Sequence, residues 1–192
     1  AIADLFKLTD TKSPTTAPLV KAAKQVVRGL AKPPKQKKPL TPQHIEQICA
    51  RAADTVKGTR DAFLMVLLFV AALRESEAVA LKQADVKLVQ TSAGEQLHVF
   101  VARAKNDQER RGHTRVVGCT CNAAATAKVC PVEWYKRWQQ KRSASAEWLF
   151  HHGKSDEPLA KSTPNSLLKK LLIGVVPDPE NYGSHSGRAG ST

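Results

Sequence analysis

The order of apolar and polar residues predicts a chain of helices with one pair of strands. Residues 14–31 have helical periodicity, and the apolar side chains of this stretch fall on one side: Leu19, Ala22, Ala23, Val26, Val27 and Leu30. A second helix is expected from residue 41, because Thr41 suits the N-cap and Pro42 the first helical position. Its inner stripe is Ile45, Ile48, Cys49 and Ala52. Both helices therefore have an apolar side to bury.

The most apolar stretch runs from Ala62 to Leu73 and predicts a helix that is covered on nearly all sides. We expect Gly58 and Thr59 to break the chain and Asp61 to start this helix. As a helix the apolar run would be about 18 Å long. That length is too short for the hydrocarbon core of a bilayer, so the stretch is assigned to the protein core and no membrane partner is expected. A short helix over 76–81 follows.

Residues 97–103 and 113–118 are rich in β-branched residues, and a polar, basic turn separates them. They predict an antiparallel hairpin. A helix begins at Pro131, with a bulky inner face made by Val132, Trp134, Tyr135 and Trp138. Residues 147–150 are expected to be extended and residues 162–172 helical. The fold class predicted is α+β, mainly helical, with a small antiparallel sheet.

Residues 31–40, AKPPKQKKPL, divide the chain. Proline removes backbone donors and like charges repel, so this stretch is predicted to be an extended basic linker. The domain organisation is then residues 1–30, the end of a helical domain; 31–40, the linker; and 41–192, a second domain. The linker either follows a phosphate backbone or is a solvated tether.

The chain carries 30 Lys and Arg against 17 Asp and Glu, a formal charge of +13. Such an excess favours a polyanionic partner, because basic side chains that neutralise phosphates release counterions. The alternative is a basic surface that is merely solvated.

Three groups of polar residues stand out from the apolar scaffold. Arg74 directly follows the most apolar stretch, and Glu77 lies one helical turn away, so the two form either a functional site or a structural ion pair. Lys105 lies at the tip of the hairpin, where a lone lysine is usually solvated. His185 and Arg188 are three residues apart and share one face if a helix begins near Ser184 or Ser186.

The four cysteines fall into two groups. Cys49 is predicted to be a buried small apolar side chain. Cys119, Cys121 and Cys130 follow His113 and are weak candidates for a Cys₃His zinc site, because their spacing departs from the usual pair of cysteines two residues apart. The alternative is a group of reduced thiols beside a loop.

The order of VLLFVAALRESEAVAL, ARAKNDQERRGHTRVV, CPVEWYKRW and YGSHSGRAGST resembles the tyrosine recombinase (phage integrase) family. It is particularly similar to integrase-like recombinases of phages, mobile elements and DIRS-like retrotransposons. The resemblance implies DNA recombination or integration, with 41–192 a catalytic domain and 1–30 the end of a DNA-binding, core-binding domain. The site residues it implies are Arg74, Glu77, Lys105, His185 and Arg188.

The resemblance further implies double-stranded DNA as partner, a homotetramer on paired DNA sites, an intracellular location (bacterial cytoplasm or eukaryotic nucleus) and no cofactor. Family members continue after His-x-x-Arg with a His or Trp and the nucleophilic tyrosine. Here the sequence ends at Thr192, and neither Tyr135 nor Tyr182 occupies that position. The chain is therefore expected to be truncated before its nucleophile and inactive in cleavage. The alternatives are a non-catalytic DNA-binding module and a small zinc-stabilised interaction domain.

Overall fold

The structure is a computed structural model of the 192-residue chain. It describes residues 14, 17–30, 36–102, 112–123, 127–153, 156–183 and 186–187. The chain divides into two compact units, Ala1–Gln36 and Lys37–Thr192, which are described separately.

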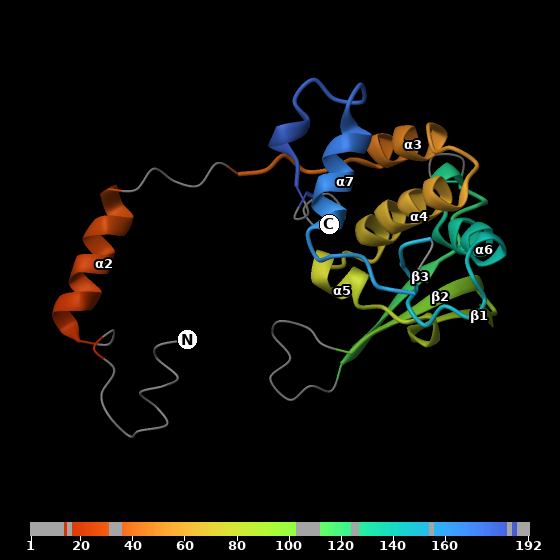
Figure 1. Ribbon diagram of the computed structural model, residues 1–192, viewed down its shortest axis with the longest axis horizontal. Coiled ribbons are helices and arrows are strands. Elements are labelled where there is room, and N and C mark those ends of the chain that lie inside the picture. The colour runs from red at the N-terminus through yellow and green to blue at the C-terminus, as the bar shows by residue number, and fades with distance from the viewer. Residues whose placement is uncertain are drawn as a thin grey trace. The chain divides into compact units, whose positions relative to one another are not determined.

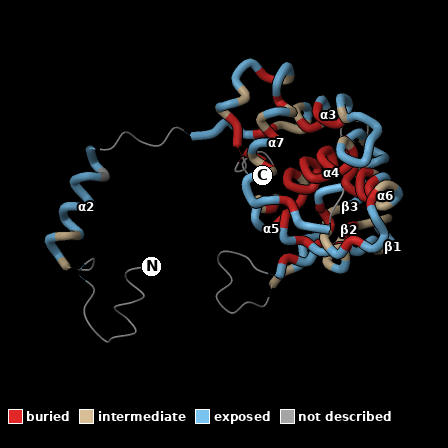
Figure 2. Tube along the Cα trace, viewed as in Figure 1, coloured by how far each residue is buried: buried red, intermediate tan, exposed pale blue. Residues whose placement is uncertain are grey.

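The first unit contains the helix α2, Pro18–Leu30, which confirms the helix predicted from residue 14 but starts four residues later. Its large apolar side chains are exposed: Leu19, Val26, Val27 and Leu30. Figure 2 shows this helix almost wholly in the colour of exposed residues.

In the described part of the second unit, four α-helices surround a central one, α4 (Figure 1). The helices are α3 Pro42–Ala50, α4 Val56–Val70, α5 Glu75–Val79, α6 Pro131–Lys141 and α7 Thr163–Leu172, with 3-10 turns η2 Gln83–Asp85, η3 Ala127–Val129 and η4 Pro179–Asn181. Among the described residues, no helix combines the length and apolarity needed to cross a membrane. The predicted start of α3 is confirmed, since the Thr41 hydroxyl accepts a hydrogen bond from the His44 N–H at 3.3 Å and Pro42 is the first helical residue.

The predicted start of α4 is wrong. The helix does not begin at Asp61 but at Val56, and it runs through Gly58. The Thr55 hydroxyl caps it by accepting the Gly58 N–H at 3.0 Å. Glycine is needed here because a Cβ at this position would lie 2.2 Å from the Ala53 carbonyl oxygen. Gly58 therefore permits a close approach of backbone to backbone and does not break the helix.

Within the described residues the strands form one three-stranded antiparallel sheet in the order β1-β2-β3. The strands are β1 Val86–Thr91, β2 Gly94–Val101 and β3 His113–Gly118. The β2–β3 hairpin confirms the predicted pairing and the bounds of its second strand. The sequence analysis missed β1, of which only Val86 is buried, so its alternation of apolar and polar residues carried little signal.

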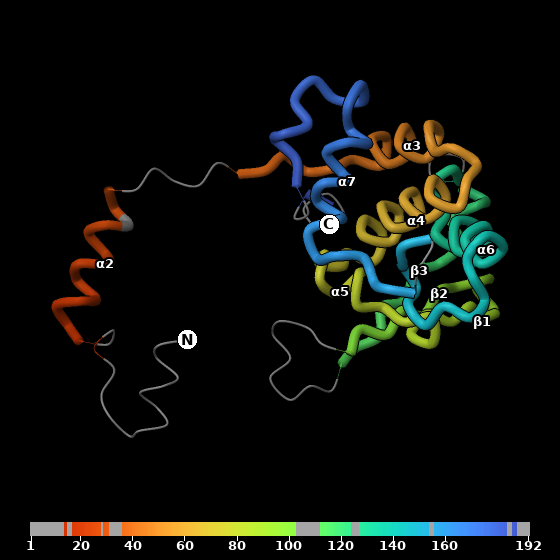
Figure 3. Tube along the Cα trace, viewed as in Figure 1, coloured from red at the N-terminus to blue at the C-terminus, as the bar shows by residue number. Residues whose placement is uncertain are grey.

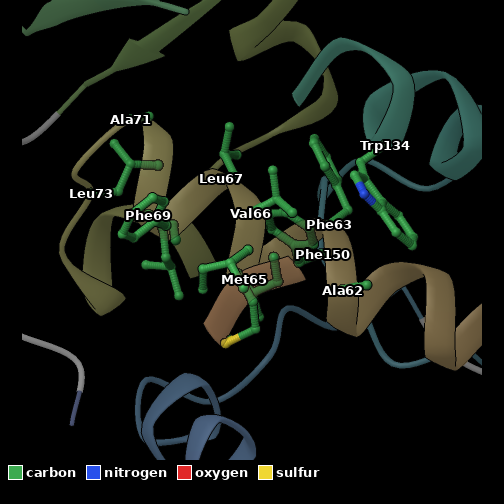
Figure 4. Close-up of a cluster of buried hydrophobic side chains, with 14 of the residues drawn as sticks. Ala62, Phe63, Met65, Val66, Leu67, Phe69, Ala71, Leu73, Trp134 and Phe150 are labelled. Carbon is green, nitrogen blue, oxygen red and sulfur yellow. The ribbon is translucent and has the colours of Figure 1, made fainter. Parts of the chain in front are cut away.

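Helix α4 is the centre of the core, with the side chains from Ala62 to Phe69 all buried. Helix α6 packs against α4 and against β2, so it lies between the central helix and the sheet. Its predicted inner face is confirmed: Val132, Trp134, Tyr135 and Trp138 are buried. Figure 4 shows Trp134 and Phe63 at one end of the buried cluster and Phe69 and Leu73 at the other. The α+β, mainly helical class is confirmed.

The second half of the predicted linker is not a solvated tether. The Lys38 N–H donates to the Asn181 carbonyl at 2.8 Å, and the Leu40 N–H donates to the Ser186 carbonyl at 2.9 Å. Leu40 is 4% exposed. Figure 3 shows this orange segment running beside the blue C-terminal part of the chain. The prediction failed because proline and lysine content says nothing about a distant partner segment.

Candidate functional site

Arg74 occupies a sharp exit from the buried helix α4. Ala71 ends the helix, and Ala72 takes a left-handed backbone conformation with φ of 49°. A non-glycine residue rarely adopts this conformation, and it turns the chain away from the helix axis. Leu73 then returns to the core at 1% exposure, so Arg74 is held between a buried anchor and the first turn of α5.

Glu77 fixes the Arg74 guanidinium. One carboxylate oxygen of Glu77 accepts the Arg74 backbone N–H at 2.8 Å, and the other accepts Arg74 Nη1 at 2.6 Å. The Glu77 side chain is 5% exposed and that of Arg74 25% exposed. A guanidinium has five N–H donors. Among the described residues only Glu77 bonds to this one, so the other donors are left for a ligand.

A groove with a volume of about 550 Å³ opens beside the first turn of α5, and Arg74 is not among its lining residues. Ser76 and Glu77 line one side of it, and Phe100, Val101 and Ala102 at the end of β2 line another. The groove therefore lies between the first turn of α5, which carries Glu77, and the base of the β2–β3 hairpin. Lys105, predicted to act from the tip of this hairpin, lies outside the described residues.

Gly112 starts the return strand of the hairpin and has φ of 67°, the left-handed region that favours glycine. A Cβ at this position would lie 2.7 Å from the Phe100 ring and 2.9 Å from the Val101 carbonyl oxygen. The hairpin base thus needs glycine here, both for its backbone conformation and for the space that the Phe100 ring occupies.

The two predicted residues His185 and Arg188 lie outside the described residues, but the two between them are described. Ser186 is fully buried, accepts the Gly183 N–H on its hydroxyl at 3.0 Å and holds Leu40 through its carbonyl. A Cβ on Gly187 would lie 3.5 Å from the Leu68 carbonyl oxygen, near the end of α4. The centre of the His-x-x-Arg segment is therefore packed near the end of the helix that leads into Arg74.

Positive side chains that the sequence analysis missed also line the groove. Lys82 and Lys161 lie there, with Trp148. The Lys82 ammonium lies 5.6 Å from the Trp148 ring centroid, and its hydrogen bond to Glu147 raises the pKa of Lys82. No sequence signal marks these residues, because they come from separate segments that only the fold brings together.

Both tyrosines of the sequence are buried, Tyr135 at 8% and Tyr182 at 7% exposure. The Tyr135 hydroxyl donates to the Val86 carbonyl at 3.3 Å, in keeping with the core position predicted for it. The Tyr182 ring packs edge-on against His44, with centroids 5.5 Å apart. Neither side chain lines the groove beside Glu77.

A second candidate site lies at the junction of β3 and α6. The sulfur atoms of Cys119, Cys121 and Cys130 all lie within 4.8 Å of one another. Desolvation of the sulfur and hydrogen bonds with the other two thiols raise the pKa of Cys121 to about 12, although the residue as a whole is exposed. Burial also acts to raise the pKa of Cys130, but hydrogen bonds from the backbone N–H groups of Glu133 and Thr120 and with the other two thiols together outweigh it, so that pKa is lowered.

The structure does not bring His113 to these thiols. His113 is paired with Val101 at one end of β3, whereas the Cys119 N–H bonds to the Glu95 carbonyl beyond the other end. Six residues of extended strand separate the two by about 20 Å. The Cys₃His ligand set is therefore corrected to the three cysteines. Cys49 is buried in α3, as predicted, and burial raises its pKa to about 12.

The mainly helical α+β fold with its small antiparallel sheet is that of tyrosine recombinase catalytic domains. The chain belongs to the phage integrase family, whose sequence profile matches residues 38–190. No curated protein matches the chain.

Solved structures share the fold at low sequence identity. XerH site-specific recombinase bound to difH substrate, in a pre-cleavage complex, is 16% identical with a TM-score of 0.58, over 84% of this chain and 43% of that one. XerH in a post-cleavage complex on palindromic difH is 13% identical with a TM-score of 0.59, over 83% and 42%. A Flpe W330F mutant in a DNA Holliday junction complex is 15% identical with a TM-score of 0.50, over 98% and 51%. This chain thus spans about half or less of each.

Proposed function

We propose that the chain is part of a site-specific DNA recombinase that cuts and rejoins DNA through a phosphotyrosyl intermediate. The observation that carries the proposal is the Arg74 guanidinium, which buried Glu77 holds by one Nη1 bond of 2.6 Å and whose other donors no further described residue engages. An arginine held in this way is suited to binding the oxygens of a phosphodiester. Family membership and the DNA complexes of the XerH and Flpe structures support the same reading.

Each site residue has a role in this proposal. Arg74 and Arg188 bind the two non-bridging phosphate oxygens and stabilise the charge that develops on them. His185 takes the proton of the attacking tyrosine or donates to a phosphate oxygen. Lys105 protonates the departing DNA oxygen, which leaves as a free hydroxyl, and Glu77 is a positioning residue for Arg74. The bond energy stays in the phosphotyrosyl link, so the step needs no added energy source.

The geometry of the described residues supports convergence of these groups. The base of the hairpin that carries Lys105 lines the same groove as Glu77. Gly187, between His185 and Arg188, packs near the end of α4, from which the chain continues to Arg74. The hairpin base therefore shares a groove with Glu77, and the His-x-x-Arg segment contacts the central helix that leads into Arg74.

The partner we propose is double-stranded DNA, and the assembly is a homotetramer on paired sites. A net charge of +13 favours such a partner, with affinity that falls steeply as salt rises. In this proposal residues 1–30 are the end of a core-binding domain, 31–36 a basic linker, and the catalytic domain begins at Lys37, four residues before the boundary predicted from the sequence.

The nucleophile is not among these 192 residues in our proposal. Tyr135 and Tyr182 are both buried and absent from the groove. We therefore expect the 192-residue chain to bind duplex DNA without forming a covalent adduct.

The test compares this chain with the same chain extended by the residues encoded downstream of Thr192. Both are incubated with a nicked suicide substrate made from the DNA that flanks the gene. We expect a covalent protein–DNA adduct from the extended chain only. Arg74→Ala in the extended chain should abolish the adduct and change duplex affinity by less than about 3-fold, since one arginine is a small part of a phosphate-dominated interface.

Three outcomes would contradict the proposal. An adduct from the 192-residue chain would place the nucleophile at Tyr135 or Tyr182. Specific binding without any adduct from the extended chain would favour a non-catalytic DNA-binding module. Loss of folding in the Arg74→Ala variant would make the Arg74–Glu77 pair structural.

A further inference from the structure

We propose that Cys119, Cys121 and Cys130 bind a zinc ion through their thiolates at the junction of β3 and α6. The three sulfur atoms lie within 4.8 Å of one another, and those of Cys119 and Cys130 are 3.6 Å apart. Zinc–sulfur bonds of about 2.3 Å in a tetrahedron place sulfur atoms about 3.8 Å apart. The cluster therefore needs only small movements to receive the ion.

The backbone around Cys130 favours its thiolate, the form that binds metal. Cys130 is the N-cap of α6, and the free N–H groups in the first turn of a helix favour a negative charge there. Its sulfur also accepts the Thr120 N–H at 3.4 Å. Three thiolates this close together would repel one another, and a divalent cation at their centre removes that repulsion.

The site presents three protein ligands and is open on one side. Cys130 is buried, whereas Cys119 and Cys121 are exposed. In the part of the chain that the structure describes, no further His, Cys, Asp or Glu joins the three sulfurs. The fourth tetrahedral position is thus accessible from solvent and is filled by water or by a small exogenous ligand.

The ion would link two parts of the fold. Cys119 directly follows β3, which pairs with β2, and Cys130 directly precedes α6, which packs on the central helix α4. Nearby, Lys136 of α6 forms an ion pair with Glu95 of β2 at 2.7 Å. A bound zinc ion would therefore fix the end of the sheet to the helical core, a role independent of the proposed recombination.

The competing chemistry is a disulfide between Cys119 and Cys130. Two thiols 3.6 Å apart need to approach to about 2.05 Å to form one, with loss of two electrons to an oxidant. A disulfide leaves Cys121 without a role, whereas zinc uses all three thiols.

The experiment titrates Co²⁺ into metal-free, fully reduced 192-residue protein under anaerobic conditions. We expect one equivalent to bind with sulfur-to-cobalt charge-transfer bands and the intense visible bands of tetrahedral cobalt, and Zn²⁺ to bleach them. Cys119→Ser, Cys121→Ser and Cys130→Ser should each weaken the apparent affinity by more than about 100-fold, since even changes to groups that only support ligands cost 10- to 100-fold. Cys49→Ala, in the buried face of α3, is the matched control and should bind like the parent chain.

Thermal unfolding provides a readout that does not depend on colour. Zinc should raise the Tm of the parent chain and of Cys49→Ala, and should leave the Tm of Cys121→Ser unchanged, because Cys121 is exposed and its replacement leaves the fold intact. Absence of thiolate bands in the reduced parent chain would overturn the proposal. So would bands that survive Cys121→Ser, or air oxidation that removes two thiols in the presence of equimolar zinc.

Discussion

The Arg74–Glu77 pair allows a quantitative test of how the candidate site is built. The perturbation is a double-mutant cycle of Arg74→Ala, Glu77→Ala and the double variant in the 192-residue chain. Glu77→Ala removes the carboxylate that accepts the Arg74 N–H at 2.8 Å at the start of α5. It also leaves the guanidinium, a quarter exposed, without its charged partner.

The magnitudes follow from these contacts. Loss of a helix-capping acceptor costs about 1 kcal/mol. Loss of a charge-assisted hydrogen bond adds about 1–2 kcal/mol for a group with this much exposure, so Glu77→Ala should cost about 2–3 kcal/mol in unfolding free energy. Arg74→Ala keeps the capping bond and should cost about 1–2 kcal/mol. If the pair acts as a unit, the double variant costs no more than Glu77→Ala alone, a coupling of about 1–2 kcal/mol.

Urea unfolding followed by circular dichroism and tryptophan fluorescence measures all four free energies. Glu133→Ala is the matched control, because Glu133 pairs with Lys136 at the same spacing along a helix but both side chains are well exposed, at 43% and 38%. This control should lose less than about 0.5 kcal/mol. Single costs that add to within about 0.3 kcal/mol in the double variant would refute the reasoning that Glu77 holds Arg74.

Three further predictions concern the scaffold. His44→Gln should flatten the decline of unfolding free energy as pH falls below the ordinary pKa of 6.5, because burial lowers the pKa of His44, the unfolded chain takes up the proton first, and that uptake favours unfolding. Gly58→Ala should lower the unfolding free energy by about 1–3 kcal/mol, since the new Cβ would lie 2.2 Å from the Ala53 carbonyl oxygen. Trp138→Phe should cost about 1–3 kcal/mol, because the Leu149 carbonyl loses a hydrogen bond of 2.8 Å from the indole N–H. Denaturant unfolding measures the unfolding free energy of each variant, and for His44→Gln it is repeated across pH. An unchanged unfolding free energy would refute the Gly58 and Trp138 predictions, and an unchanged pH dependence would refute the His44 prediction.

Patterns confined to one element were readable from the sequence. The Thr41–Pro42 signal set the start of α3, and the spacing of Val132, Trp134, Tyr135 and Trp138 gave the buried side of α6. Two errors came from reading residue types without their neighbours. Gly58 was taken as a helix breaker, although it makes room for the Ala53 carbonyl within α4. The second half of the proline- and lysine-rich stretch was taken as a tether, although Leu40 is buried against the C-terminal segment.

The candidate site was readable in part. The spacing of Arg74 and Glu77 gave their contact, because residues three apart meet on one helical turn. The groove lysines could not be predicted, since Lys82 and Lys161 are brought together only by the fold. The sequence also could not show which residues belong to the cysteine cluster. His113 and Cys119 lie at opposite ends of β3, whereas Cys130 lies beside Cys119. This arrangement depends on where β3 begins and ends, which the sequence did not fix.

A position at the end of α4 suits the phosphate chemistry that we propose for the site. Charge that develops on a phosphate is stabilised only by groups that are already in place, which demands side chains mounted on rigid elements. Helix α4 is such an element, because its side chains from Ala62 to Phe69 are all buried. The left-handed turn at Ala72 and the buried Leu73 fix the backbone position of Arg74 relative to this helix, and Glu77 then fixes the guanidinium itself. The same central helix receives Gly187 near its end, so a change in its packing should disturb both arginine segments together.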